Sequence, residues 1–110
     1  MKLSEIVKNL SLTPVHLEYS DADVKTAYTS DLLSDVMGNA PEEAILITIQ
    51  AHKNTLAVAT LKDSPAIIIC NNRPIPEDFL EAAKEEKVGI FLTKKNQYEI
   101  SGLLYTLLNN

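Results

Sequence analysis

Glycine is scarce in this chain of 110 residues, which has only three glycines, one cysteine and no tryptophan. The glycines stand far apart, at positions 38, 89 and 102, and neither G-x-G-x-x-G nor the phosphate-cradling loop G-x-x-x-x-G-K-[ST] occurs. The G-x-S-x-G elbow of hydrolases and the H-E-x-x-H helix of zinc proteases are also missing. The sequence therefore predicts no catalytic residue and gives no support to catalysis on nucleotides.

A single cysteine excludes an intrachain disulfide and a zinc site built from several thiolates. The sequence has no long apolar run and no basic, apolar leader at its start. Its net charge is −5, with the acidic residues spread along the chain, whereas nucleic-acid binding needs a concentrated basic face. We therefore expect a cytoplasmic protein that binds neither nucleic acid nor membrane and holds no metal or cofactor.

The length and composition are those of one folded domain. Apolar residues make up 45% of the chain and charged residues 23%, as in soluble globular proteins. A chain of this length buries roughly 65% of the surface that its unfolded form exposes, which is enough for stability without metal or disulfide. No repeat or linker interrupts the sequence, so residues 1–110 are predicted to form a single domain.

The first forty residues predict two helices and two strands. Four apolar residues recur at helical spacing: Leu3, Ile6, Val7 and Leu10. Residues 15–19 alternate apolar and polar, as in a half-exposed strand, and residues 24–30 are rich in β-branched and aromatic side chains, as in a second strand. The alternation places three apolar residues on one face: Val15, Leu17 and Tyr19. A helix over residues 31–37 is predicted to end at Gly38 or Asn39, both suited to a left-handed C-terminal position.

Strands and helices alternate from residue 45 onward. Three apolar runs have the pattern of strands covered on both faces: residues 44–50, 66–70 and 90–93. Asn54 is expected to cap a helix over residues 55–63, although "LAVAT" within it would also suit a strand. The helix after the second run is predicted to end at Gly89. Asn96 and Glu99 form a capping-box pattern before the last helix.

This order predicts a single small α/β domain with a mainly parallel central sheet and helices on both faces. Ligands of such sheets bind beyond the carboxyl ends of the strands, where the loops meet at one edge. The candidate ligand-binding residues there are Ser30, Asp31, Gln50, His52, Asn54 and Arg73. A small anionic metabolite or a nucleotide is the ligand that we expect at this crevice.

Each candidate also has a structural interpretation. Ser30 and Asp31 are residue types that cap a helix, and Asp31 would repel an anion. His52 could act as a general base or switch, but a solvated loop histidine gives the same pattern. Arg73 could bind a carboxylate or phosphate through two hydrogen bonds, or fasten its loop to the domain or to a partner subunit. Cys70 ends an apolar strand, which favours a buried thiol over a nucleophile.

Three stretches of the chain resemble the small DRTGG-domain proteins. They read "YTSDLLSDVM" (28–37), "ILITIQAHKNTLAVA" (45–59) and "AIIICNNRPIPEDFLEAAKEEKVGIFLT" (66–93). The motif that names the family should lie in "DADVKTAY", but Ala22, Thr26 and Ala27 stand where an arginine and two glycines are expected. The resemblance implies an α/β domain related to the N-terminal domain of the bacterial HPr kinase/phosphorylase. Stand-alone members resemble regulators encoded near iron-only hydrogenase systems.

The same family occurs as a module of CBS-domain pyrophosphatases, where it resembles a dimerisation element. In the last predicted helix, Ser101 and Gly102 permit close helix approach beside Tyr98 and Tyr105, although a helix that only covers the sheet would share its apolar stripe. That stripe comprises Ile100, Leu103, Leu104, Leu107 and Leu108. We expect a non-catalytic regulatory or interaction module that forms a homodimer. The alternatives are a sensor domain for a small metabolite or nucleotide, and an enzyme in which His52 acts with Asp31.

Overall fold

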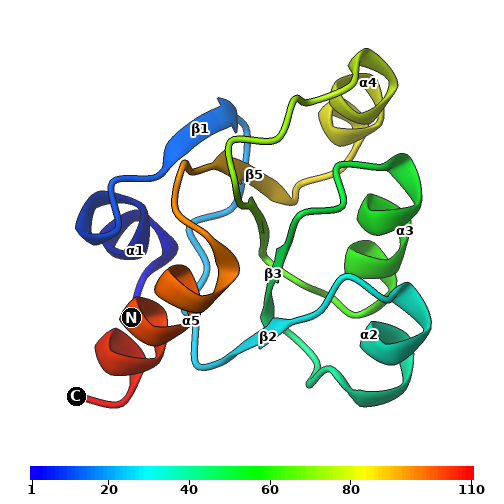
Figure 1. Cartoon of the computed structure of the whole chain (residues 1–110). Coiled ribbons are helices and arrows are strands. Elements are labelled where there is room, and N and C mark those ends of the chain that lie inside the picture. The colour runs from blue at the N-terminus through cyan, green and yellow to red at the C-terminus, as the bar shows by residue number, and fades with distance from the viewer.

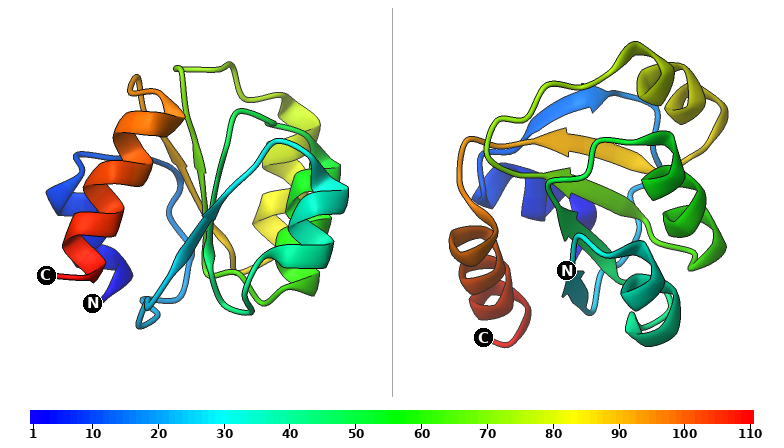
Figure 2. Two further views of the ribbon diagram at one scale, coloured as in Figure 1. Left: turned by 60° about the horizontal axis from the view of Figure 1, so that its bottom comes forward. Right: turned by 45° about the vertical axis from the view of Figure 1, so that its right-hand side comes forward.

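One sheet of five strands, in the order β1-β5-β4-β3-β2, lies between two layers of helices in this computed structural model of residues 1–110 (Figures 1 and 2). The strands are β1 (Thr13–His16), β2 (Ala27–Thr29), β3 (Ile45–Thr48), β4 (Ala66–Ile69) and β5 (Gly89–Leu92). The helices are α1 (Leu3–Asn9), α2 (Leu33–Asn39), α3 (Lys53–Leu61), α4 (Glu77–Glu85) and α5 (Gln97–Leu108). Figure 2 shows α1 and α5 on one face of the sheet and α2, α3 and α4 on the other.

Strands β2, β3, β4 and β5 are parallel, and β1 pairs antiparallel with β5 at one edge. The predicted fold class, a small α/β domain with a mainly parallel sheet and helices on both faces, is therefore confirmed. The edge strand β1 contains Pro14, and its register shifts between Pro14 and His16. Proline lacks the N–H that a central strand must donate, so it is confined to such edges. None of the five helices combines the length and apolar character needed to span a bilayer.

The core has one part on each face of the sheet, which explains the continuous apolar runs. Successive side chains of a strand point to opposite faces. Ile45 and Ile47 of β3 therefore pack with α1 and α5, whereas Leu46 packs with the helices of the other face. Every residue of β3 and β4 is buried. These two strands lie in the interior of the sheet, and their side chains are buried on both faces.

The first strand lies earlier in the chain than the predicted residues 15–19. Leu17, expected on the covered face, is 80% exposed, whereas His16 is only 8% exposed. The register shift beside Pro14 breaks the alternation on which that prediction depended. The ring of His16 instead faces inward, with Nε2 3.3 Å from the carbonyl oxygen of Glu86.

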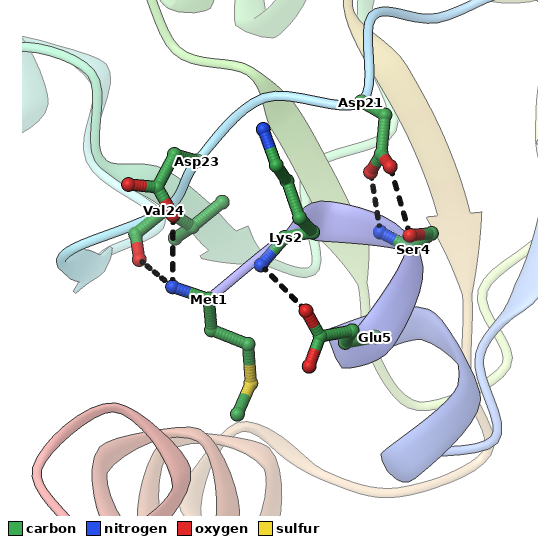
Figure 3. Close-up of polar contacts among 7 residues, drawn as sticks. All are labelled: Met1, Lys2, Ser4, Glu5, Asp21, Asp23 and Val24. Carbon is green, nitrogen blue, oxygen red and sulfur yellow. Dashed lines mark hydrogen bonds and ion pairs between the residues drawn. The ribbon is translucent and has the colours of Figure 1, made fainter.

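The second strand is also shorter than the predicted residues 24–30. Its first part pairs with the amino-terminal segment instead of the sheet (Figure 3). The N–H of Val24 donates to the carbonyl of Met1, and the N–H and hydroxyl of Ser4 donate to the carboxylate of Asp21 at 2.8 and 2.9 Å. The Met1 ammonium contacts Asp23 at 2.9 Å. These contacts hold α1 against the chain that enters β2.

Two helix ends differ from expectation. No glycine has a positive φ, nor does Asn39, and Ala40 leaves α2 in extended conformation with φ −67°. The predicted left-handed end at Gly38 or Asn39 is therefore wrong. Helix α4 ends at Glu85, and Gly89 is the first residue of β5. A Cβ at Gly89 would lie 2.8 Å from Cε2 of Phe91, so this glycine serves packing rather than helix termination.

Candidate functional site at the strand ends

The loops that follow the parallel strands meet at one edge of the sheet. The N–H of Asn71 donates to the carbonyl of Lys95 at 3.0 Å, and the N–H of Asn72 donates to the carbonyl of Thr93 at 2.8 Å. Both asparagines have positive φ values, 61° and 51°, a conformation that asparagine adopts more readily than most residues. The loops after β4 and β5 thus form one continuous surface.

Asp31 joins the loops after β2 and β3 to the start of α5. Its Oδ1 accepts hydrogen bonds from the hydroxyl of Thr48 at 2.8 Å, the N–H of Ile49 at 2.9 Å and the side-chain amide of Gln97 at 3.0 Å. Three donors on one carboxylate oxygen fix the side chain in place. Asp31 is therefore a structural tie between three elements that are distant in sequence.

Neither Ser30 nor Asp31 caps α2, so that interpretation is wrong. The helix begins at Leu33, and its N-cap residue, Leu32, makes no side-chain capping bond. Asp31 is occupied by β3 and α5 instead. The hydroxyl of Ser30 accepts the N–H of Leu32 at 3.2 Å, which closes a local turn before the helix.

Thr48 and Gln97, which both donate to Asp31, were not among the predicted site residues. Thr48 is fully buried at the end of an otherwise apolar strand, and a hydroxyl in that position needs a hydrogen-bond partner. A single hydroxyl in an apolar strand was therefore the sequence feature that could have identified Thr48 as a hydrogen-bonded site residue. Gln97 follows the capping residue Asn96 and has no sequence feature that points to Asp31. The capping box of Asn96 and Glu99 is present as predicted.

His52, and not Asn54, caps α3. Nδ1 of His52 accepts the N–H of Asn54 at 3.0 Å, so the predicted cap lies two residues too late. A neutral imidazole has one lone-pair nitrogen, and here that nitrogen is the capping acceptor. The proton of neutral His52 then sits on Nε2. His52 can accept a proton from a substrate only by releasing the helix cap.

The remaining candidates lie on the surface. Gln50, Asn54 and Arg73 are exposed, and the backbone N–H of Gln50 donates to the hydroxyl of Thr48 at 3.1 Å. The two ion pairs of the molecule, Met1 with Asp23 and Lys62 with Glu42, do not involve this edge. Four cations near the strand ends therefore have no ion-pair partner: Lys53, Arg73, Lys94 and Lys95.

Cys70 lies directly after β4 and is fully buried, as predicted. Burial, with a smaller contribution from the negative charge of Asp31, raises the pKa of its thiol to about 11. The thiolate is the nucleophilic form of cysteine. Cys70 is consequently an inert part of the core at neutral pH. No group of three or more His, Cys, Asp or Glu side chains is arranged to hold a metal ion.

Residues 46–108, more than half of the chain, match the family described as the HPr Serine kinase N terminus. The chain belongs to this family. A search of curated proteins finds no match to the chain. The matched part includes Gln50, His52, Asn54 and Arg73 of the strand-end edge.

Ser30 and Asp31 lie outside the part that matches the HPr serine kinase N-terminus family. Residues 28–37, which carry the strongest DRTGG resemblance, also lie outside it, so the narrower DRTGG assignment stays a prediction. The relation to the N-terminal domain of the HPr kinase is supported by the match.

Two hollows of this HPr serine kinase N-terminus domain lie away from the strand ends. One, of about 360 Å³, lies between β2 and α5, and Lys25, Thr29 and Ser101 are among its lining residues. The other, of about 740 Å³, is a shallow depression over α5 beside Tyr98, Gly102 and Tyr105. The unpaired positive charges thus lie at the strand ends, whereas these two concave surfaces lie beside β2 and α5.

Proposed function

We propose that this chain is a non-catalytic regulatory module that forms a homodimer and senses a small anionic metabolite or a nucleotide at the carboxyl ends of its strands. The observation that carries the ligand proposal is the charge of this edge. Lys53, Arg73, Lys94 and Lys95 all lie in the segments that follow these strands and have no ion-pair partners, in a chain whose net charge is −5. Asp31, the carboxylate of this edge, already accepts three hydrogen bonds.

The hydrogen bonding of the polar groups supports a non-catalytic role. A general base needs a lone pair that is free to reach a proton of the substrate. The lone pair of neutral His52 holds the N–H of Asn54, and Oδ1 of Asp31 is occupied by three donors. Cys70 is buried in the protonated form. An enzyme that uses His52 as its general base would have to break the cap of α3.

The homodimer, the cytoplasmic location and a link to iron-only hydrogenase systems complete the proposal. The dimer draws support from the exposed tyrosines of α5, since Tyr98 is 88% exposed and Tyr105 is 71% exposed. A cytoplasmic location suits a lone thiol, which that compartment keeps reduced. The hydrogenase link rests on the DRTGG resemblance alone.

Thermal unfolding with inorganic phosphate and with ATP tests the ligand proposal, with sodium chloride at equal ionic strength as the reference. A ligand that binds only the folded state stabilises it, by about 2.7 kcal/mol when its concentration is 100 times Kd. We expect one of the two anions to raise Tm. The double variant Arg73→Gln, Lys95→Gln should lose this rise, whereas Lys8→Gln on α1 should keep it.

No rise with either anion, or the same rise in both variants, would contradict an anion site at the strand ends. Lys8 is a suitable control because it is exposed and lies on a helix that does not follow a sheet strand.

A further inference from the structure

The outer edge of β2 is open. Its pairing to β3 uses the carbonyl of Thr26 and the N–H of Ser30, at 3.1 and 3.2 Å. Because backbone groups of a strand alternate in direction, Ala27 and Thr29 point their N–H and C=O groups away from β3. Proteins usually block such an edge with proline, lysine or a bulge. The opposite edge strand has Pro14 and a register shift, whereas β2, which is only three residues long, contains neither a proline nor a bulge.

Helix α5, beside this edge, has the surface composition of an interface. Glu99 is the only charged residue among its twelve residues, while 23% of the whole chain is charged. Tyr98 and Tyr105 are 88% and 71% exposed, and Leu103 is 44% exposed. The cores of protein interfaces are rich in tyrosine and poor in charge. Part of the apolar stripe of α5 thus faces solvent rather than the sheet.

We propose that β2 and α5 together dock a second copy of this chain, with the two β2 strands antiparallel about a twofold axis at Tyr28. This inference rests on the proposed homodimer and locates its interface. Residues equally distant from Tyr28 then lie opposite each other. Ala27 faces Thr29 of the second copy, and both present free backbone groups to form a hydrogen-bonded pair. The two sheets join into one.

The charges next to β2 complement each other in this register. Lys25 and Asp31 are each three residues from Tyr28, so the lysine of one copy lies opposite the aspartate of the other. Lys25 is exposed and has no ion-pair partner within its own chain. Opposite charges across a strand pair stabilise the pairing, and like charges destabilise it. The sequence around Tyr28 is therefore complementary to itself.

The same axis suits α5. The hydroxyls of Thr29 and Ser101 are 2.7 Å apart, which places Ser101 beside the last residue of β2, one position from Tyr28. An axis through that level brings Ser101 and Gly102 of the two helices together, where small side chains allow close approach. Tyr98 and Tyr105 are equally distant from this centre, so each lies opposite the other in the second copy. Figure 2 shows α5 on the face of the sheet beside β2.

A second copy fits this surface better than an unrelated extended peptide. A peptide needs only the open edge and sets no requirement on the symmetry of the sequence. Here the strand and the helix each have a sequence that is complementary to itself, and the Thr29–Ser101 contact places the middle of α5 within one residue of Tyr28. Isologous pairing has this property by definition.

Sedimentation velocity with the full chain, from low to high micromolar concentration, tests the interface through two matched glycine variants. A Cβ at Gly102 or at Gly38 would meet nothing within 4 Å, so both positions accept a side chain in the folded monomer. Gly102→Glu would place two like charges together at the proposed axis and should raise the dimer Kd by about tenfold or more. Gly38→Glu, on α2, adds the same charge and should leave Kd unchanged.

Oxidative cross-linking of a Tyr28→Cys variant tests the register. Directly opposite residues of an antiparallel pair have Cα atoms about 4.5–5.5 Å apart, which suits a disulfide. We expect Tyr28→Cys to form a covalent dimer and Ser34→Cys, exposed on α2, to form none. The same dimer Kd for both glycine variants, or the same yield of covalent dimer for both cysteine variants, would contradict this interface without contradicting the homodimer. A wild-type chain that is monomeric at high micromolar concentration would overturn both.

Discussion

Two fully buried threonines of this domain differ in what their hydroxyls contact. At Thr48 the hydroxyl donates to Asp31 and accepts the N–H of Gln50. At Thr55, on α3, the hydroxyl has no hydrogen-bond partner. A buried polar group without a partner costs about 1–3 kcal/mol, and its loss is neutral or stabilising.

Replacement of each threonine by valine, which has nearly the same shape, should therefore have opposite effects. Thr48→Val should lower the free energy of unfolding by about 1–3 kcal/mol, because it leaves Asp31 short of a donor. Thr55→Val should raise it by about 1 kcal/mol. Urea unfolding of the two variants measures both changes. Destabilisation of similar size in both would show that hydrogen bonding does not decide the outcome.

Residue type identified the polar groups of the strand ends but not their partners. Asn54 and His52 are both polar residues at the start of α3, and only the geometry of that turn shows that the helix begins at Lys53 and is capped by His52. Asp31 takes its donors from Thr48 and from Gln97, which lies 66 residues further along the chain. Such a contact depends on the packing of α5 against the sheet, and no local pattern contains that information.

At the scale of elements, prediction succeeded where the signal is local. Helices α1 and α5 have clear apolar spacing or a capping box, β4 is apolar throughout, and β3 is apolar up to Thr48. The edge strands β1 and β2 were predicted too long or too late. Their limits are set by neighbours, through the register shift beside Pro14 and the bridge between Lys2 and Asp23.

The glycines at the start of β5 and near the end of α2 should respond in opposite ways to alanine. Gly89→Ala puts a methyl group 2.8 Å from the ring of Phe91, which is fully buried and cannot move freely. We expect a loss of about 1–3 kcal/mol in unfolding free energy. The added methyl group of Gly38→Ala has no atom within 4 Å, and this variant should raise the free energy of unfolding by about 0.5–1 kcal/mol, since alanine favours a helix. Thermal and urea unfolding measure both, and equal effects would refute this packing argument.

Acid sensitivity is a property of the whole molecule, because three carboxylates from different parts of it accept hydrogen bonds in the folded state that stabilise their charged form. The N–H and then the hydroxyl of Ser4 lower the pKa of Asp21. The Met1 ammonium lowers the pKa of Asp23, and the hydroxyl of Tyr28 lowers that of Asp35. The folded state therefore resists protonation at these sites more than the unfolded chain does.

The sign of the pH dependence follows from these lowered values. The stabilisation is complete above the pKa of the unfolded chain, about 4, and is lost as the pH falls through the lower pKa of the folded state. Asp21→Asn should reduce stability at pH 7 and flatten its decline on acidification. Glu81→Gln, at an exposed position on α4, should leave the curve unchanged. Urea midpoints between pH 7 and pH 2.5 provide the comparison, and parallel curves for Asp21→Asn and wild type would contradict it.

The two unequal edges of the sheet determine how large an assembly can grow. β1 lacks a backbone donor at Pro14 and shifts its register, so further strand addition is blocked on that side. β2 can accept one strand, and after it has paired with its own copy no open edge is left. Each molecule can therefore pair with only one further strand, at β2. In the proposed dimer, association by this route would stop at two chains, because the exposed edge that could seed a fibre would be covered by the second copy.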